Sequence, residues 1–111
     1  MAQLLASKCR ALGASEVLVD EIDTAPGRPN VYALWRSSAP GARWCGIDVH
    51  IDTVAVKGMT PYPPFGGHLS ADGRLHGRGS CDTKATLANV LSLLEEHGCD
   101  WLPQAEGRHS R

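Results

Sequence analysis

The sequence predicts a small α/β domain, and three observations support that prediction. The chain has 111 residues, enough for one domain with a modest core, and its composition of 42% hydrophobic and 21% charged residues is typical of globular proteins. Two segments carry apolar residues at helical spacing, and three short runs rich in valine, isoleucine and leucine lie between them. We therefore expect a sheet of about three or more strands with helices packed on it.

The first predicted helix covers residues 2–12. Its apolar stripe consists of Leu5, Cys9 and Leu12 at positions i, i+4 and i+7. Gly13 follows directly, and glycine at this position commonly ends a helix because it adopts a left-handed backbone conformation without steric cost. The segment is therefore a first helix of the domain.

Three strands are predicted next, over residues 16–22, 31–36 and 44–51. Each run is rich in β-branched or aromatic residues and is bounded by loops that contain proline and glycine. Side chains alternate along a strand, so His50 and Asp52 share one face at the end of the third strand. In open α/β sheets the carboxyl end of a strand is where ligands usually bind.

The remaining elements are a short hairpin and a second helix. Residues 68–76 contain an Ala-Asp-Gly turn signal between two extended pieces. A helix is predicted over residues 84–97, with Gly98 at its C-terminal end and with one apolar face formed by Leu87, Val90, Leu91 and Leu94. We assign residues 1–98 to the domain and residues 99–111 to an irregular tail.

Charge and cysteine content restrict the function classes. The net charge of −1 gives no reason to expect nucleic acid or an anionic membrane as a partner, and no apolar run approaches the ~20 residues of a membrane span. Lys8 and Arg10 interrupt the N-terminal apolar run, which argues against a secretory signal; an organelle transit segment is the less favoured alternative. Cys9, Cys45, Cys81 and Cys99 lie far apart with no C-x-x-C pair, which argues against a zinc knuckle, a redox motif or a disulfide-dense secreted fold. A reducing cytoplasm is therefore the default expectation.

A His-x-Asp pair begins the stretch that carries chemistry. His50 and Asp52 suit two arrangements: both bind a metal ion, or His50 binds it while Asp52 orients the imidazole ring through a hydrogen bond. A plain exposed polar pair at a strand end is the alternative for this motif by itself.

The motif GRGSCDTK supplies the second cluster. Gly77 and Gly79 allow close approach of the backbone, and Arg78 can pair with a carboxylate. Asp82 precedes the second helix, whose N-terminus favours an ionised carboxylate, and Thr83 is suited to cap that helix. The alternative is a glycine-rich turn with a capping aspartate. A phosphate-binding loop is excluded, because no Gly-Lys-Ser/Thr follows the glycines.

Taken together, HIDTV, PFGG, DGRLHGRG and CDTK resemble the signature region of a family of zinc metallohydrolases. That family includes acetylornithine deacetylase, succinyl-diaminopimelate desuccinylase, aminoacylase and the glutamate-releasing carboxypeptidases such as carboxypeptidase G. The acetylornithine deacetylase-like branch is the nearest in appearance. The resemblance covers residues 12–94 and implies an incomplete three-layer catalytic domain.

The resemblance also implies site roles. His50 and Asp82 would be metal ligands, with Asp82 bridging two zinc ions (cobalt being a possible substitute) and Asp52 orienting the His50 ring. A cis peptide bond would join Asp82 to Thr83. The reaction would be hydrolysis of an amide or peptide bond in an N-acyl amino acid or peptide by metal-activated water, with a glutamate as general base.

Departures from the family pattern are mild, whereas the missing parts are substantial. Ala55 and Ala85 stand where the family usually has proline and glycine, at positions that carry no proposed chemistry. The adjacent glutamates Glu95 and Glu96 lie about 20 Å along a helix from Asp82, so we interpret them as a solvated helix end and not as the general base. His68, His76, His97 and His109 have no family counterpart, although His76 is near enough in sequence to Asp82 to be an opportunistic ligand.

Two hypotheses follow. The first is a fragment of a zinc amidohydrolase, truncated, frame-shifted or encoded as one piece of a split gene, which binds zinc weakly and is inactive alone. The second is a non-catalytic α/β remnant or protein-interaction module whose open sheet edge favours association. A redox role for Cys81 is a distant third, because the neighbouring Asp82 disfavours a thiolate.

Overall fold

The computed structural model describes residues 1–21, 26–38, 40–57 and 61–99. Its elements form two compact units, one of Met1–Ile47 with Leu91–Arg111 and one of Asp48–Val90, and each unit is described by itself. The predicted tail lies outside the described residues except for Cys99. No helix among these residues is long and apolar enough to span a membrane.

Helix α1 covers Ala2–Ala11, which confirms the first predicted helix. It ends where Gly13 adopts a φ of 78°. Two backbone hydrogen bonds close the helix end, from Gly13 N–H to the Arg10 carbonyl at 3.0 Å and from Ala14 N–H to the Cys9 carbonyl at 3.1 Å. This pair of bonds is the Schellman arrangement, which satisfies carbonyls that the helix itself leaves without partners.

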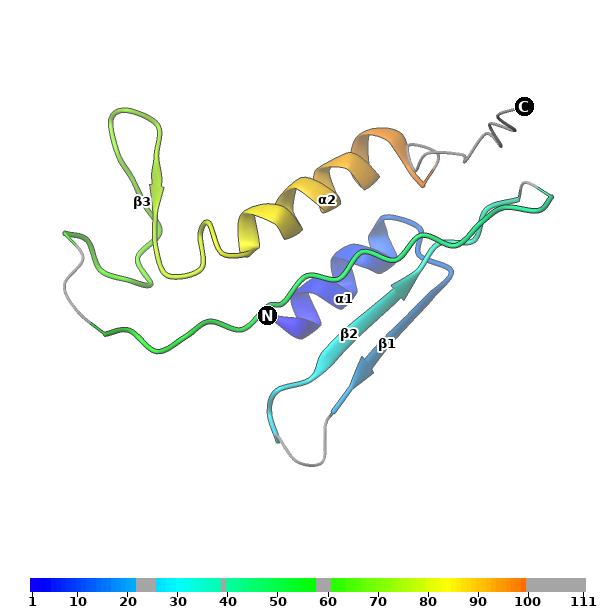
Figure 1. Ribbon diagram of the computed structural model, residues 1–111, viewed down its shortest axis with the longest axis horizontal. Coiled ribbons are helices and arrows are strands. Elements are labelled where there is room, and N and C mark those ends of the chain that lie inside the picture. The colour runs from blue at the N-terminus through cyan, green and yellow to red at the C-terminus, as the bar shows by residue number, and fades with distance from the viewer. Residues whose placement is uncertain (22–25, 39, 58–60, 100–111) are drawn as a thin grey trace, which may run out of the picture. The chain divides into compact units, whose positions relative to one another are not determined.

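Helix α1 packs on a β-hairpin of strands β1 (Glu16–Asp20) and β2 (Asn30–Leu34), which pair antiparallel (Figure 1). The indole N–H of Trp35 donates to the Leu12 carbonyl at 3.0 Å and ties the chain after β2 to the end of the helix. The small core of this unit is formed by Ala2, Ala6, Cys9 and Leu94.

The second unit contains a shorter hairpin, of strands β3 (His68–Leu69) and β4 (Leu75–His76). Gly73 has a φ of 81° in the turn, and the Ser70 N–H donates to the Arg74 carbonyl at 2.9 Å across it. Both observations confirm the predicted turn, in which glycine supplies the left-handed conformation.

Helix α2 covers Lys84–His97, the range predicted from its apolar spacing. Leu94 on the predicted apolar face is buried. Gly98 has a φ of 64° and its N–H donates to the Leu94 carbonyl at 3.0 Å, so the predicted C-terminal glycine is also confirmed.

The third predicted strand is wrong, and with it the single sheet of three or more strands. Residues 44–51 adopt no strand structure, and the strands among the described residues form two separate two-stranded sheets. No backbone hydrogen bond joins residues 44–51 to another described segment. A strand needs a neighbour for its N–H and C=O groups, and alternating apolar residues alone do not supply one.

Candidate metal centre

The segment that carries His50 keeps the alternation expected of a strand although it has no partner strand. Val49 and Ile51 are half-buried, whereas His50 and Asp52 are exposed. The two polar side chains therefore share one side of an extended backbone. The predicted pairing of their side chains depends on this local conformation and not on a sheet.

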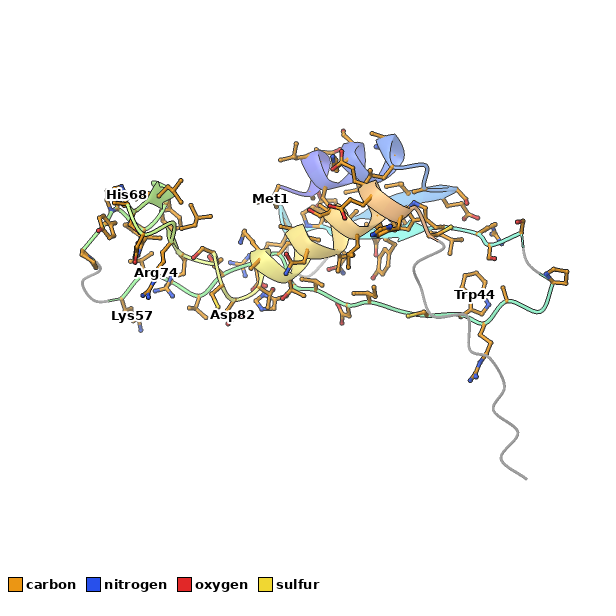
Figure 2. All side chains as sticks on the ribbon, turned by 90° about the horizontal axis from the view of Figure 1, so that it is seen from above. Met1, Trp44, Lys57, His68, Arg74 and Asp82 are labelled. Carbon is orange, nitrogen blue, oxygen red and sulfur yellow. The ribbon has the colours of Figure 1, made fainter. Side chains whose placement is uncertain are left out.

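The structure brings together the three predicted site residues. His50 Nδ1 lies 3.1 Å from Asp52 Oδ1, and His50 Nε2 lies 3.0 Å from Asp82 Oδ1. Half of the His50 side chain and 83% of each aspartate side chain is exposed, so ions in solution can reach the site. Figure 2 shows Asp82 just ahead of helix α2, as the sequence predicted.

Two hydrogen bonds hold the segment of Asp82 against the segment of His50. The Thr83 hydroxyl donates to the His50 carbonyl at 2.8 Å, and the Lys84 ammonium donates to the Ile51 carbonyl at 3.1 Å. The Thr83 side chain, expected to cap helix α2, thus bonds to the neighbouring segment. The peptide bond between Asp82 and Thr83 is cis, as the resemblance implies.

Gly79 makes this close approach possible. It is buried and has a φ of 81°, a conformation that side-chain-bearing residues rarely adopt. A Cβ atom at this position would lie 2.7 Å from Thr53 Cγ2 and 2.9 Å from Lys84 Nζ. The second glycine of the GRG motif is therefore required both for its backbone conformation and for its lack of a side chain.

The two aspartates stabilise a protonated His50. The hydrogen bond to Asp82 is the largest effect raising the pKa of His50 above its ordinary value, with the Asp52 bonds adding to it and partial desolvation opposing it. A neutral imidazole has one N–H group, so when Nδ1–H donates to Asp52, Nε2 carries no proton. Only the charged ring has a second N–H group that can donate from Nε2 to Asp82. In the neutral ring the same tautomer presents the Nε2 lone pair toward Asp82.

That tautomer fits a metal ligand. Two ligand atoms held about 2.1 Å from one ion at a tetrahedral angle lie about 3.4 Å apart, a few tenths of an ångström more than the observed separation of His50 Nε2 and Asp82 Oδ1. Asp52 occupies the other ring nitrogen, the usual arrangement around a metal-bound histidine. Within the described part of the chain, however, no group of three or more histidine, cysteine or carboxylate side chains could hold an ion.

The adjacent glutamates belong to the other compact unit and make contacts of their own. Glu95 and Glu96 are both exposed at the end of helix α2, where Glu95 pairs with Lys8 at 2.9 Å and Glu96 lies 3.6 Å from His97. The interpretation of a solvated helix end is confirmed.

His76 is also engaged elsewhere. Its Nε2 lies 3.2 Å from the Ser70 hydroxyl, and its ring packs against Tyr62 with the ring centroids 4.5 Å apart. His109 lies outside the described residues.

The sequence did not predict one residue that helps to position the site. Lys84 fixes the Ile51 carbonyl, and this contact depends on two segments meeting in space. The only signal in the sequence is its place at the end of GRGSCDTK, two residues after Asp82.

Comparisons with known proteins match the stretch of sequence that carries this site. The profile of Peptidase family M20/M25/M40 matches residues 46–104, just over half of the chain, and this range contains all three site residues. A succinyl-diaminopimelate desuccinylase of Methylobacterium radiotolerans is 36% identical in an alignment of 81 residues that covers 68% of this chain. Succinyl-diaminopimelate desuccinylase 2 of Ruegeria sp. is 35% identical in an alignment of 72 residues that covers 63% of this chain.

The matched stretches cover only 20% and 18% of those two relatives, so the chain spans about a fifth of their length. No solved structure matches the chain. The family match, the two relatives and the signature residues agree on one assignment. The chain belongs to Peptidase family M20/M25/M40, a family of metal-dependent amide hydrolases.

Proposed function

We propose that this chain supplies the first part of the metal centre of an amide hydrolase. His50 and Asp82 are the metal ligands, and Asp52 is a positioning residue that holds the His50 ring. The single observation that supports this most is the 3.0 Å approach of His50 Nε2 to Asp82 Oδ1 across 32 residues of sequence. Zinc is the proposed ion and cobalt a substitute, because imidazole and carboxylate ligands suit both.

The proposed roles of the chain's own residues are to hold the metal ion and to orient its ligands. Asp52 accepts a hydrogen bond from the Nδ1–H of His50, which leaves the Nε2 lone pair of the neutral ring facing Asp82. Asp82 would hold the metal through its carboxylate, and the family resemblance assigns to it the role of a bridging ligand. A divalent ion bound here supplies a Lewis acid and an activated water for amide hydrolysis.

Two ligands are fewer than a catalytic zinc ordinarily uses, which is three protein ligands plus water. We therefore propose that groups beyond the described residues provide the remaining ligands and the glutamate base, within a three-layer domain. The chain by itself is expected to bind zinc weakly and to hydrolyse nothing. The compartment proposed is the reducing cytoplasm, consistent with the free state of Cys9, Cys45, Cys81 and Cys99.

The proposed substrates are N-acyl amino acids or peptides. The two relatives are named for removing a succinyl group from diaminopimelate, and acetylornithine deacetylase, which the signature motifs resemble, acts on the same kind of bond. N-acetylornithine and N-succinyl-diaminopimelate are both amides of an amino acid with a small acyl group. We therefore propose hydrolysis of this class of amide bond, by an acetylornithine deacetylase-like or a desuccinylase-like activity.

Calorimetric titration with zinc tests the proposed ligands. We expect weak one-site binding to the wild-type chain and a loss of at least about tenfold in affinity for His50→Ala and for Asp82→Asn, since each removes a ligand. Equal affinity in all three proteins would refute the ligand assignment. A parallel assay with N-acetylornithine and N-succinyl-diaminopimelate should show no turnover, and turnover that a chelator abolishes would refute the proposed inactivity.

The second candidate is a non-catalytic interaction module, and the exposure of large apolar side chains favours it. Trp44, in the segment without a strand partner, is 75% exposed (Figure 2). Val54 and Phe65, which lie later in the chain, are 73% and 78% exposed. Such surfaces promote association. Size-exclusion chromatography separates the two candidates: an oligomer that does not depend on zinc favours the module, and a compact form that appears only with zinc favours the metal centre.

A further inference from the structure

A small cavity in the Asp48–Val90 unit is left unused by the proposed metal centre. It has a volume of about 110 Å³ and is lined by Tyr62, Pro64, His76, Gly77 and Arg78. One water molecule takes about 30 Å³ of liquid, and pockets that enclose a whole ligand start at about 300 Å³. The cavity therefore has room for one polar end group and not for an entire substrate.

The residues that line the cavity are fixed by a backbone hydrogen bond and by contacts between aromatic rings. The Arg78 N–H donates to the Pro64 carbonyl at 2.6 Å, which joins the proline-rich loop to the GRG motif. Tyr62 stacks on His68 with the ring centroids 4.0 Å apart and also packs against His76. The cavity is consequently part of the folded hairpin region and not a gap between loose segments.

Arg78 supplies a charge that nothing in the described chain neutralises. Its Nε atom is buried and has no hydrogen-bond partner, and no carboxylate among the described residues pairs with its side chain. Arg74 in the same hairpin shows the ordinary situation, with its Nε 3.2 Å from Asp72. A buried N–H group without an acceptor is uncommon and costly, and the half-buried guanidinium lines the cavity without a carboxylate partner among the described residues, so an acceptor in the cavity is favoured.

Asp72, the acid in the turn between β3 and β4, does not compete for the place beside Arg78. The Ser70 hydroxyl donates to Asp72, which is the largest effect lowering the pKa of the Asp72 carboxyl, and Arg74 also pairs with it. The single Ser70 hydroxyl proton goes to Asp72 or to the Arg74 carbonyl, so in the 3.2 Å contact between His76 Nε2 and the Ser70 hydroxyl the imidazole is the donor. Asp72 is thus ionised and already satisfied, and the cavity keeps its positive character.

We propose that this cavity is a binding site for a small carboxylate group, with Arg78 as its main anchor and Tyr62 and His76 as its side walls. A guanidinium matches a planar carboxylate better than a tetrahedral or spherical anion, because its N–H groups form a planar fork. The site does not require the metal centre, so it stands or falls separately from the proposed function.

The test is a nuclear magnetic resonance titration of the metal-free, ¹⁵N-labelled full chain with sodium acetate at constant ionic strength. We expect saturable shifts of the Arg78 Nε–H signal and of the amides of residues 76–78. In Arg78→Lys, which keeps the charge and loses the fork, the affinity read from those amides should fall about tenfold or more, the scale of one charge-assisted hydrogen bond. Arg74→Lys is the matched control and should bind acetate as the wild type does.

Several results would overturn the proposal. These are shifts that do not saturate, equal shifts with sodium chloride, tighter binding of inorganic phosphate than of acetate, or equal weakening in both variants. If circular dichroism shows that Arg78→Lys is unfolded, the wild-type Nε–H signal decides alone, because it reports directly on the buried donor.

Discussion

Each of the two compact units is stabilised internally, and the kind of interaction differs between them. In the unit that contains α1, apolar side chains are buried between the helix and its hairpin, with Ala6 fully buried and Cys9 nearly so. In the Asp48–Val90 unit, the described positions include one buried residue, Gly79, and the contacts that define the site are hydrogen bonds to backbone carbonyls. Apolar spacing predicts the first kind of unit well, and only specific motifs predict the second kind.

Ala6→Asp should have the largest effect, because it places a charge at a position of 0% exposure on the helix face that contacts the hairpin. We expect a loss of about 3 kcal/mol or more in the free energy of unfolding, measured by urea denaturation. Ser7→Asp is the matched control on the exposed face of the same helix and should change stability by less than about 0.5 kcal/mol. Equal effects of the two changes would mean that α1 does not pack as described.

Gly79→Ala should have the next largest effect, in the polar unit. The new methyl group meets Thr53 and Lys84 at under 3 Å, and the residue is forced to keep a positive φ. We expect a loss of about 2–4 kcal/mol in unfolding free energy. Gly73→Ala is the control, since Gly73 also has a φ of 81° but nothing within 4 Å of its Cβ position, and it should cost only about 1–2 kcal/mol. If the two variants cost the same, crowding at Gly79 plays no part.

Lys84→Met should affect the site more than the fold. The change keeps the side-chain length and removes the hydrogen bond to the Ile51 carbonyl, a loss of about 0.5–1.5 kcal/mol. Cobalt affinity, followed by visible absorption, should fall about three- to tenfold as the His50 segment loosens. Lys57→Met, an exposed lysine of the same unit, should leave the affinity unchanged. A weaker affinity in Lys57→Met alone would refute the positioning role of Lys84.

The smallest expected effect is a pH dependence centred on His50. Its pKa is raised in the folded chain, so its pairing with the aspartates stabilises the metal-free protein below about pH 6.5, the ordinary imidazole value, and that contribution is lost as the pH rises through the raised pKa. Metal affinity depends on pH in the opposite direction and increases as the pH rises through the His50 pKa, because the metal binds the neutral ring. In Asp82→Asn the His50 pKa, followed by magnetic resonance, should move down toward its ordinary value; an unchanged pKa would contradict the role of Asp82.

The sequence predicted much of the local structure. Both helices and the glycines that end them follow from apolar spacing and backbone preference, which act within a few residues. The strand predicted over residues 44–51 failed because a strand also needs a hydrogen-bonding neighbour, which no pattern within those residues provides.

The site, too, has features that the sequence predicted and features that it did not. The meeting of His50 with Asp82 was expected from the family signature, whereas spacing alone left a capping aspartate as an equal alternative. The Lys84 contact and the cavity at Arg78 could not be predicted, because each depends on which distant loop the motif meets after folding. The family signature predicted the ligands, and only the folded geometry showed which contacts position those side chains.

The most direct test of the metal-centre proposal is the protonation state of the His50 ring during zinc titration. Long-range ¹H–¹⁵N spectra of the wild-type chain above the raised pKa should show Nδ1 protonated throughout and a zinc-dependent shift confined to Nε2, because Asp52 holds the first nitrogen and the metal takes the second. A shift at Nδ1, or no change at His50 at any zinc concentration that the protein tolerates, would contradict the account.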